Sequence, residues 1–238
     1  NKASNIAIAN KEMIIAGGFT LINKIKKTKN ILIPLDSEHF SLIGSITSNK
    51  SLKKLYITAS GGPFYSKKNI NLDNVKLKKV LSHPKWKMGI NNSIDSSNFV
   101  NKLLEIYEVA IIYGVDLRKI DFLISPEAYI HSIVVRSDNI ININCFDNDM
   151  IIPLTRPLQH FYPKINLQNK STFLNFKKLQ LENFNDKRFK IYKYLDIFKK
   201  LDSHKQISFM ILNNIAHKKY LSGEILYNDI IDFIMSKL

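Results

Sequence analysis

The sequence is poor in several residues that would assign it to a particular class of protein. Cys145 is the one cysteine among 238 residues, so the chain can form neither an internal disulfide nor a cysteine-based zinc site. No apolar run approaches the ~18 residues of a membrane-spanning helix, which argues against an integral membrane protein. Hydrophobic residues make up 45% of the chain, more than a disordered protein contains. We therefore expect a folded protein with one large domain or two smaller ones.

Arginine is also scarce, although the chain carries a formal net charge of +15. Its 35 cationic side chains are 31 lysines and only four arginines, and the lysines are scattered. Nucleic-acid-binding proteins favour arginine for bidentate contacts and gather their cations on one surface. A nucleic-acid-binding module is therefore only an alternative, and we expect no nucleic-acid partner. An anionic substrate explains part of the charge, because a positive field raises its local concentration.

Chain-breaking residues divide the sequence into two regions. Seven of the eight glycines lie at or before Gly114, and all seven prolines lie at or before Pro163. This distribution predicts a mixed α/β region followed by a mainly helical one. The hydrophobic patterns predict strands at 6–9, 31–35, 55–59, 122–124, 130–135 and 140–145, and helices at 10–27, 95–113, 188–201 and 206–237.

Two carboxylates, Asp36 and Glu38, follow the predicted strand at 31–35. At the end of a strand, a spacing of two directs both side chains to the same side. Carboxylates held together repel each other, and a divalent cation relieves that repulsion. Oxygen ligands alone suit Mg²⁺ or Mn²⁺ rather than zinc. The pair therefore predicts a metal site, with an exposed turn that binds nothing as the alternative.

The predicted helix at 95–113, capped by Asp95 or Ser96, gathers a second polar group. Free backbone N–H groups at its N-terminus, beside Ser96, would bind an anion that Lys102 could also reach. An ordinary amphipathic surface helix is the alternative. The polar residues that share one face, at spacings of three, four and seven, are Asn98, Asn101, Lys102 and Glu105.

Two loops between these elements could close on a ligand. Ser60-Gly61-Gly62-Pro63 follows a predicted strand, and its glycines would let the backbone approach a phosphate closely. The segment from His83 to Gly89 contains the only tryptophan, Trp86, beside Met88. A loop of this kind can close over a polar substrate and exclude water. The alternatives are a tight turn without a ligand and a tryptophan packed on the core.

Seven motifs follow one another along the chain. They are Asn10-Lys11-Glu12, Pro34-Leu35-Asp36-Ser37-Glu38-His39, Ser60-Gly61-Gly62-Pro63-Phe64, His83-Pro84-Lys85-Trp86-Lys87-Met88-Gly89, Asp95-Ser96, Asn101-Lys102-Leu103-Leu104-Glu105 and Ile130-His131-Ser132. Together and in this order they resemble 1-deoxy-D-xylulose 5-phosphate reductoisomerase. The resemblance runs from Asn5 to about Pro157 and continues faintly to the end of the chain.

The resemblance implies an activity and a set of site residues. Members of this family rearrange 1-deoxy-D-xylulose 5-phosphate and reduce the product with NADPH to 2-C-methyl-D-erythritol 4-phosphate, in non-mevalonate isoprenoid biosynthesis. Asp36, Glu38 and Glu105 are implied to hold Mg²⁺ or Mn²⁺, which acts as Lewis acid and template; Lys11 is implied as a further catalytic residue. The residues implied to bind substrate are Ser37, Ser60, His83, Trp86, Met88, Ser96, Asn101 and Lys102. Those implied to bind NADPH are Asn10, Lys11, Glu12, Gly89 and Met150.

The sequence also departs from the family pattern. No Gly-x-Gly-x-x-Gly turn is present, so we expect the N-terminal Rossmann domain to be missing and this chain alone to be incomplete as an enzyme. The family's His-Pro-Gln-Ser reads Ser125-Pro126-Glu127-Ala128 here, so an imidazole near the site is absent. The alternative to an enzyme is a degenerate, non-catalytic relic that binds a sugar phosphate or a protein partner.

We expect an α/β (α+β) architecture in four parts. Residues 1–35 would be the tail end of the NADPH-binding domain, 36–160 the catalytic metal- and substrate-binding domain with a mixed sheet, 161–186 a linker and 187–238 a small C-terminal helical domain. The resemblance implies a homodimer paired through the catalytic domain, and we expect no membrane association. The 25 asparagines and many lysines indicate an AT-rich, reduced genome and a bacterial cytoplasmic protein, with a plastid as the alternative.

Overall fold

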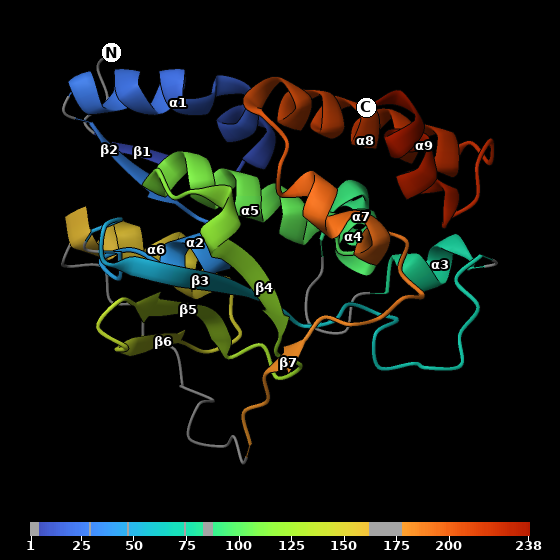
Figure 1. Cartoon of the computed structure of the whole chain (residues 1–238), viewed down its shortest axis with the longest axis horizontal. Helices are drawn as coiled ribbons and strands as arrows, with labels where there is room; N and C mark the ends of the chain where they lie inside the picture. The colour runs from blue at the N-terminus through green and yellow to red at the C-terminus, as the bar shows by residue number, and fades with distance from the viewer. Residues whose placement is uncertain (1–4, 29, 47, 74, 83–87, 162–177) are drawn as a thin grey trace.

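Figure 1 shows the computed structural model of the chain, which describes residues 5–28, 30–46, 48–73, 75–82, 88–161 and 178–238. Helices lie over a mixed β-sheet, and a second, two-stranded sheet stands beside it. The mixed α/β fold class expected from the sequence is confirmed.

The N-terminal strand, helix and strand form where predicted, but the helix is kinked at Gly18, whose φ of 51° is not helical. β1 (Asn5–Ile8) and β2 (Ile31–Pro34) pair in parallel, and α1 (Lys11–Lys27) connects them. Asn10 caps α1, because its side-chain oxygen accepts a hydrogen bond from the backbone N–H of Met13 at 2.7 Å. Since parallel strands end at the same edge of their sheet, the start of α1 and the segment after β2 lie next to each other.

The larger sheet has five strands in the order β6-β5-β3-β4-β7. Its central strand, β3 (Leu52–Ala59), is parallel to β4 (Ile120–Ile124) and antiparallel to β5 (Ile130–Arg136). β6 (Ile141–Cys145) pairs with β5 at one edge, and β7 (Glu182–Asn183) pairs with β4 at the other. The sheet is therefore mixed, as expected.

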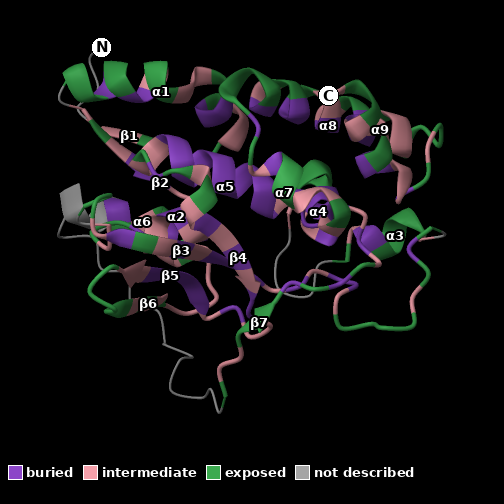
Figure 2. Cartoon of the chain, in the orientation of Figure 1, coloured by how far each residue is buried: buried purple, intermediate pink, exposed green. Residues whose placement is uncertain are grey.

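Helix α5 (Val100–Tyr113) lies between the sheet and α1, as Figures 1 and 2 show. Every residue from 102 to 111 is buried. The Tyr107 ring meets that of Phe209 edge-on, with centroids 6.0 Å apart, so α5 also contacts the C-terminal helices. The alternative of an amphipathic surface helix is therefore excluded. The polar side chains in this stretch of α5 do not face solvent but are buried inside the molecule.

The predicted helix at 95–113 is wrong at its start. The structure has a separate helix, α4 (Ile90–Ser97), and a break at Phe99, whose φ is 67°. Asn98 holds the break, because its side-chain oxygen accepts a hydrogen bond from the first backbone N–H of α5 at 3.0 Å. Ser96 therefore lies in the last turn of α4, so the predicted anion site at a helix N-terminus beside it is not formed.

The C-terminal region is helical, as predicted, but divided differently. The predicted helix at 206–237 is two helices, α8 (Ser203–Leu221) and α9 (Asp229–Lys237), and α7 (Ile191–Phe198) precedes them. Residues 162–177 of the predicted linker lie outside the described part, and its end contains β7. The helices that the sequence did not predict are α2 (Ser37–Ser41), α3 (Leu77–Val80), α6 (Ile151–Phe161) and a 3-10 turn at Leu117–Lys119.

An aromatic cluster joins the sheet to the C-terminal region. The ring of Phe99 stacks on Phe122 of β4, with centroids 5.9 Å apart, and meets Phe184 and Phe189 at 4.4 Å and 4.8 Å. All four side chains belong to one continuous hydrophobic core, which also includes residues of α7, α8 and α9. The predicted domain boundaries stay a prediction.

Exposed apolar side chains gather at the edge strand β6. Ile141 and Ile143 are 58% and 52% exposed, and their alternation places them on the same face of the strand. Ile140, just before β6, is 51% exposed. We call these three residues the β6 strip. None of the helices in the described part of the chain is both long and apolar enough to cross a membrane.

Candidate active site

A cavity of about 400 Å³ opens between the end of β2, the end of β3, α4 and α5. The sequence-predicted residues that line it are Lys11, Asp36, Ser37, Glu38, Ser60, Met88, Ser96, Asn101, Lys102, Glu105 and Met150. Segments that are far apart in the sequence thus meet around one space.

Asp36 and Glu38 reach the cavity from a helix start rather than from a strand end. Asp36 is the N-cap of α2, and one of its carboxylate oxygens accepts a hydrogen bond from the backbone N–H of Glu38 at 3.3 Å. An aspartate at this position satisfies a free N–H of the first turn. The expected same-side placement holds, because the cap brings both carboxylates to the edge where β1 and β2 end.

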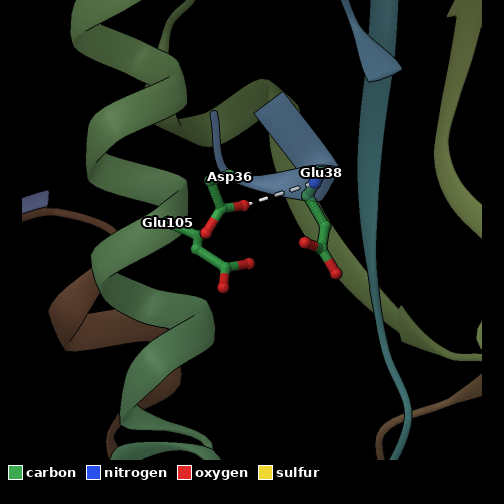
Figure 3. A group of neighbouring side chains, drawn as sticks. All are labelled: Asp36, Glu38 and Glu105. Carbon is green, nitrogen blue, oxygen red and sulfur yellow. Dashed lines mark hydrogen bonds between the residues drawn. The ribbon is translucent and has the colours of Figure 1, made fainter. Parts of the chain in front are cut away.

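Glu105 completes a group of three carboxylates. Figure 3 shows the side chains of Asp36, Glu38 and Glu105 turned towards one another, the first two from the start of α2 and the third from α5. One oxygen from each lies within 4.8 Å of the others. Glu105 is 1% exposed, so this acidic group is not an ordinary solvated surface.

Two lysines provide the countercharge. Lys11 Nζ lies 2.5 Å from Asp36 Oδ2, and Lys102 Nζ lies 2.8 Å from Glu38 Oε1 and 2.7 Å from Glu105 Oε2. Three carboxylates against two ammonium groups leave a net charge of −1 when all five are ionised. Burial lowers the pKa of each lysine, but the surrounding carboxylates outweigh it and raise both above the usual value, so both stay charged.

The carboxyl groups respond differently to this environment. Burial raises the pKa of Glu105 to about 8, and the charge of Asp36 adds to the rise against the opposing effect of Lys102. Burial also acts to raise the pKa of Asp36, but Lys11 and His39 hold it well below its usual range. Asp36 is therefore a permanently ionised group, whereas Glu105 can carry a proton.

The three carboxylates fit a hard divalent cation. They offer only oxygen donors, which suit Mg²⁺ or Mn²⁺ rather than zinc. Their oxygens converge from α2 and α5, and the net charge of −1 that the group carries when Glu105 is ionised favours a cation. Asn101 donates a hydrogen bond from its side-chain nitrogen to Glu105 Oε1 and so fixes the carboxylate that α5 supplies.

His39 contacts this centre through Asp36 and the backbone of Glu105. It belongs to the motif around Asp36, but no role was assigned to it from the sequence. It is fully buried. Its Nδ1 lies 3.3 Å from Asp36 Oδ1 and 3.4 Å from Glu108 Oε2, and its Nε2 lies 3.0 Å from the backbone oxygen of Glu105. Because a carbonyl oxygen only accepts, Nε2 donates that hydrogen bond. Burial lowers the pKa of His39, but Glu108 and Asp36 outweigh it and raise the pKa overall.

Hydroxyl and amide groups also line the cavity, beside the Lys102 ammonium that pairs with two of the three carboxylates. Ser60 and Ser96 line it from the turn after β3 and from α4, and Asn101 lines it from α5. The turn after β3 requires glycine at position 62, where φ is +60° and a Cβ would stand 2.8 Å from the backbone oxygen of Ser96. Polar hydrogen-bond donors beside a cation suit an anionic or phosphorylated ligand.

His131 is a cavity residue that appeared in a motif but was not assigned a role. It is 2% exposed, lines the cavity, and stacks on the ring of Phe146 with centroids 3.7 Å apart. Burial lowers the pKa of its imidazole. A neutral imidazole is therefore available at the cavity wall formed by β5. Asn92 of α4 also lines the cavity, and no sequence signal pointed to it.

Three of the predicted site residues that the structure describes do not join the others. Asn10, Glu12 and Gly89 do not line the cavity. Asn10 instead caps α1, one residue before Lys11. His83 and Trp86 lie outside the described residues. Ser125, which replaces an expected imidazole, is fully buried at the end of β4 and is not part of the cavity lining.

Comparisons with a family model, with curated proteins and with solved structures all point to the same family. Residues 32–113 match the family model described as the 1-deoxy-D-xylulose 5-phosphate reductoisomerase C-terminal domain. The chain is 34% identical over 228 residues to the 1-deoxy-D-xylulose 5-phosphate reductoisomerase of Pelagibacter ubique, covering 94% of this chain and 58% of that protein. It is 33% identical to that of Clostridium novyi, covering 98% of this chain and 61% of that protein. The chain thus spans about three-fifths of the length of these relatives.

Solved structures show the same fold. The Zymomonas mobilis 1-deoxy-D-xylulose 5-phosphate reductoisomerase in complex with NADPH superimposes with a TM-score of 0.83 at 26% identity, covering 98% of this chain and 60% of that one. A DOX-P reductoisomerase in complex with NADPH, fosmidomycin and magnesium superimposes with a TM-score of 0.84 at 28% identity, with the same coverage.

Proposed function

The chain belongs to the 1-deoxy-D-xylulose 5-phosphate reductoisomerase family, and on that premise we propose that it is the metal- and substrate-binding part of such an enzyme. The reaction is the rearrangement of 1-deoxy-D-xylulose 5-phosphate and its NADPH-dependent reduction to 2-C-methyl-D-erythritol 4-phosphate, in isoprenoid biosynthesis. Solved relatives bind NADPH and magnesium. Mn²⁺ is proposed as an equivalent metal, because both ions take oxygen ligands.

The convergence of Asp36, Glu38 and Glu105 in the cavity is the observation that carries this proposal. A bound divalent cation would act as a Lewis acid on the substrate's oxygens. Asn101 and Lys102 would orient Glu105 and keep the acidic group compact in the absence of metal.

The remaining polar groups would fix the two ends of the substrate. Ser60, Ser96, Asn101 and Lys102 would hold the phosphate and the neighbouring hydroxyls, since all four line the cavity with hydrogen-bond donors. Lys11 and Ser37 would contact the reacting end; Ser37 already donates a hydrogen bond to Glu38 at 2.6 Å. Other roles proposed from the resemblance are substrate contacts for His83, Trp86 and Met88 and NADPH contacts for Asn10, Lys11, Glu12, Gly89 and Met150.

NADPH would need further protein to be held. The 238 residues contain no Gly-x-Gly-x-x-Gly turn, and such a turn is what brings a pyrophosphate to a helix N-terminus in Rossmann folds. We therefore propose that the pyrophosphate is bound by protein outside these residues. Residues 5–34 would then be the edge of that nucleotide-binding part. The relatives named above are bacterial, and the proposed location is the bacterial cytoplasm.

Calorimetric titration of 1-deoxy-D-xylulose 5-phosphate into the chain tests the function, with Mg²⁺ and with a chelator. The expected result is binding that requires the metal. The Asp36→Asn variant should lose this binding, and Asp121→Asn, a carboxylate paired with lysines outside the cavity, should retain it. Circular dichroism of both variants checks that they fold. Equal binding by Asp36→Asn and the wild-type chain would contradict the metal assignment, and metal-independent binding would favour the non-catalytic relic.

We further propose that the chain pairs with a second copy through its catalytic domain, at the β6 strip. Its isoleucines are about half exposed, and burying them against a copy of themselves would remove apolar surface from water. Sedimentation of Ile141→Lys/Ile143→Lys should show a monomer where the wild-type chain is a dimer. Ile211→Lys, a 50% exposed isoleucine on α8, is the matched control and should leave the dimer intact. A dimer that survives the double substitution would place the interface elsewhere.

A further inference from the structure

Three consecutive residues in the last turn of α4 connect the cavity to the C-terminal helices. Ser96 lines the cavity, whereas its two neighbours, Asp95 and Ser97, are buried on the other side. Each neighbour makes a hydrogen bond to a residue more than a hundred positions later in the chain. Ser96 is therefore flanked on both sides by residues that the C-terminal region holds.

The first of these contacts fixes the Asp95 carboxylate. Asn213 Nδ2 donates a hydrogen bond to Asp95 Oδ1 at 2.9 Å, and His217 Nε2 lies 2.9 Å from the same oxygen. Asn213 and His217 are one turn apart on α8. The side chains of Asp95, Asn213 and His217 are all at most 7% exposed. Since a buried polar group that loses its partner has no water to replace it, this contact resists displacement of α4 relative to α8.

The second contact fixes Ser97. Its hydroxyl oxygen lies 3.0 Å from the hydroxyl of Tyr227, which precedes α9. Ser97 is fully buried and Tyr227 is 3% exposed. The Tyr227 ring also packs edge-on against Phe64, with centroids 5.7 Å apart. Phe64 follows the glycine turn after β3, so Tyr227 contacts both of the elements that bear the cavity serines Ser60 and Ser96.

The glycine turn after β3 also contacts Ser96, through its backbone. The position of a Cβ at Gly62 lies 2.8 Å from the backbone oxygen of Ser96 and 3.5 Å from the Cα of Ser97. The turn and the end of α4 are therefore in direct backbone contact. Ser96 lies between this turn and the contacts of Asp95 and Ser97 with the C-terminal region, which leaves it little freedom to move along or away from the cavity wall.

We propose that Tyr227 and Asn213 are positioning residues for the anion-binding end of the cavity. Neither residue lines the cavity. They act through Ser97 and Asp95 and set the place where the Ser96 hydroxyl meets a phosphate group. The C-terminal helices would then belong to the binding machinery rather than only to the hydrophobic core. The identity of the ligand rests on the proposed function, but the positioning role is measurable with inorganic phosphate alone.

The test uses the whole chain and two tyrosine variants. Tyr227→Phe removes only the hydroxyl that meets Ser97. Tyr220→Phe is the matched control: it makes the same change on α8, in a ring 6.0 Å from that of Tyr227, and its hydroxyl has no hydrogen-bond partner among the described residues. Calorimetry measures the affinity of each variant for inorganic phosphate and, separately, for Mg²⁺. Thermal unfolding is recorded in parallel.

Tyr227→Phe is expected to weaken phosphate binding roughly fivefold to tenfold, the size expected for one lost hydrogen bond, and to leave Mg²⁺ affinity unchanged. Ser97→Ala should cause at least the same loss, because it also removes the hydrogen bond that Ser97 donates to the backbone oxygen of Ile94 at 2.7 Å. The double variant should lose no more than Ser97→Ala alone, because Tyr227 acts through the Ser97 hydroxyl. Tyr220→Phe should leave both affinities unchanged.

Three results would overturn the proposal. They are unchanged phosphate affinity in Tyr227→Phe, an equal fall in Mg²⁺ affinity that indicates general loosening, and a wild-type chain that does not bind phosphate. Failure of the proposed function is distinguishable from these, since it would appear as phosphate binding without metal-dependent binding of 1-deoxy-D-xylulose 5-phosphate.

Discussion

Individual side chains of the cavity balance one another's charge before any ligand binds. Lys102 bridges Glu38 and Glu105, and Lys11 neutralises Asp36. Carboxylates without such partners would be strongly destabilising at this degree of burial. The lysines therefore allow an acidic centre to exist in the folded chain, and a cation that binds there competes with them for the same oxygens.

Substitution of Lys102 should expose this balance. Lys102→Met leaves Glu38 and Glu105 without their shared cation and should reduce the free energy of unfolding by about 3 kcal/mol in the absence of metal. Added Mg²⁺ should restore part of the loss, because it binds the folded state and replaces the missing charge. Urea unfolding with and without Mg²⁺ measures both effects.

Lys54→Met is the control. The side chains of the ion pair between Lys54 and Asp121 are 30% and 31% exposed, so this pair is far less buried than the cavity lysines. Its loss should cost less than about 1 kcal/mol and should not respond to Mg²⁺. A Lys102→Met variant as stable as the control would show that the acidic centre does not depend on its lysines.

The raised pKa of Glu105 gives metal binding a pH dependence. With a pKa of about 8, Glu105 is mainly protonated at neutral pH in the metal-free chain. A cation binds the ionised form, so uptake below that pKa releases a proton and affinity increases with pH until Glu105 is ionised. Calorimetry of Mg²⁺ binding in buffers of different ionisation enthalpy should detect close to one released proton at about pH 6.5 and almost none at about pH 9. The absence of proton release at the lower pH would be inconsistent with a protonated Glu105.

The sequence predicted some of these residues better than others. Asp36 and Glu38 could be paired from their spacing, but nothing local connects them to Glu105, and the family resemblance supplied that link. His39 shows the limit of such reasoning. Its Nδ1 lies near Asp36, three residues away, and near the buried Glu108 on α5. Glu108 reaches His39 only because α5 packs against α2, which the sequence does not reveal.

Among the elements, the glycine turn after β3 carries the strongest steric constraint on the cavity. Gly62→Ala would place a methyl group 2.8 Å from the backbone oxygen of Ser96, in a conformation with positive φ. Because backbone cannot rotate away as a side chain can, the turn and α4 must separate. We expect the free energy of unfolding to fall by about 2 to 3 kcal/mol and phosphate affinity to fall with it. Urea unfolding and phosphate titration measure these changes.

Gly223→Ala separates backbone strain from the steric clash. Gly223 also has a positive φ, of +80°, but a Cβ there has no atom within 4 Å. This variant should lose only about 1 kcal/mol and keep its phosphate affinity. If both variants lost the same stability and neither lost phosphate affinity, the close approach of Gly62 to Ser96 would have no functional consequence.

The break between α4 and α5 shows why element boundaries escaped the sequence. Residues 95–99 contain neither glycine nor proline, so local rules favour one continuous helix. Besides the Asn98 cap, the left-handed Phe99 is held by its aromatic neighbours Phe184 and Phe189, which lie more than eighty positions away. The error arose from tertiary packing. α6 was also missed. Pro153 lies in its first turn, where a proline lacks only an N–H that the helix leaves unpaired, whereas Pro157 lies inside the helix, where local rules disfavour it.

At the scale of the whole molecule, most arginines form ion pairs within the chain. Three of the four arginines pair with an aspartate two residues away, which leaves their guanidinium groups engaged locally; the pairs are Arg118 with Asp116, Arg136 with Asp138 and Arg188 with Asp186. Bidentate recognition of bases or phosphates needs such groups to be available. The arrangement therefore supports the expectation of no nucleic-acid partner.

Titration with a random-sequence DNA duplex checks this expectation. With a net charge of +15 the chain should show at most non-specific binding, with a Kd weaker than ~10⁻⁶ M at physiological salt and a further fall as salt increases. The folding and metal affinity of the same sample serve as controls for intact protein. Tight binding that resists salt would revive the nucleic-acid alternative.

The contact between Ser97 and Tyr227, which joins residues 130 positions apart, also has a consequence for biosynthesis. A chain emerging from the ribosome presents its carboxylates and the end of α4 long before Tyr227 is translated. Such a nascent chain can bring the carboxylates together early, but Ser96 stays loosely held until Tyr227 has left the ribosome. Truncated translation products that end before Tyr227 should therefore be recognisable by their chemistry, as species that capture metal and retain phosphate poorly.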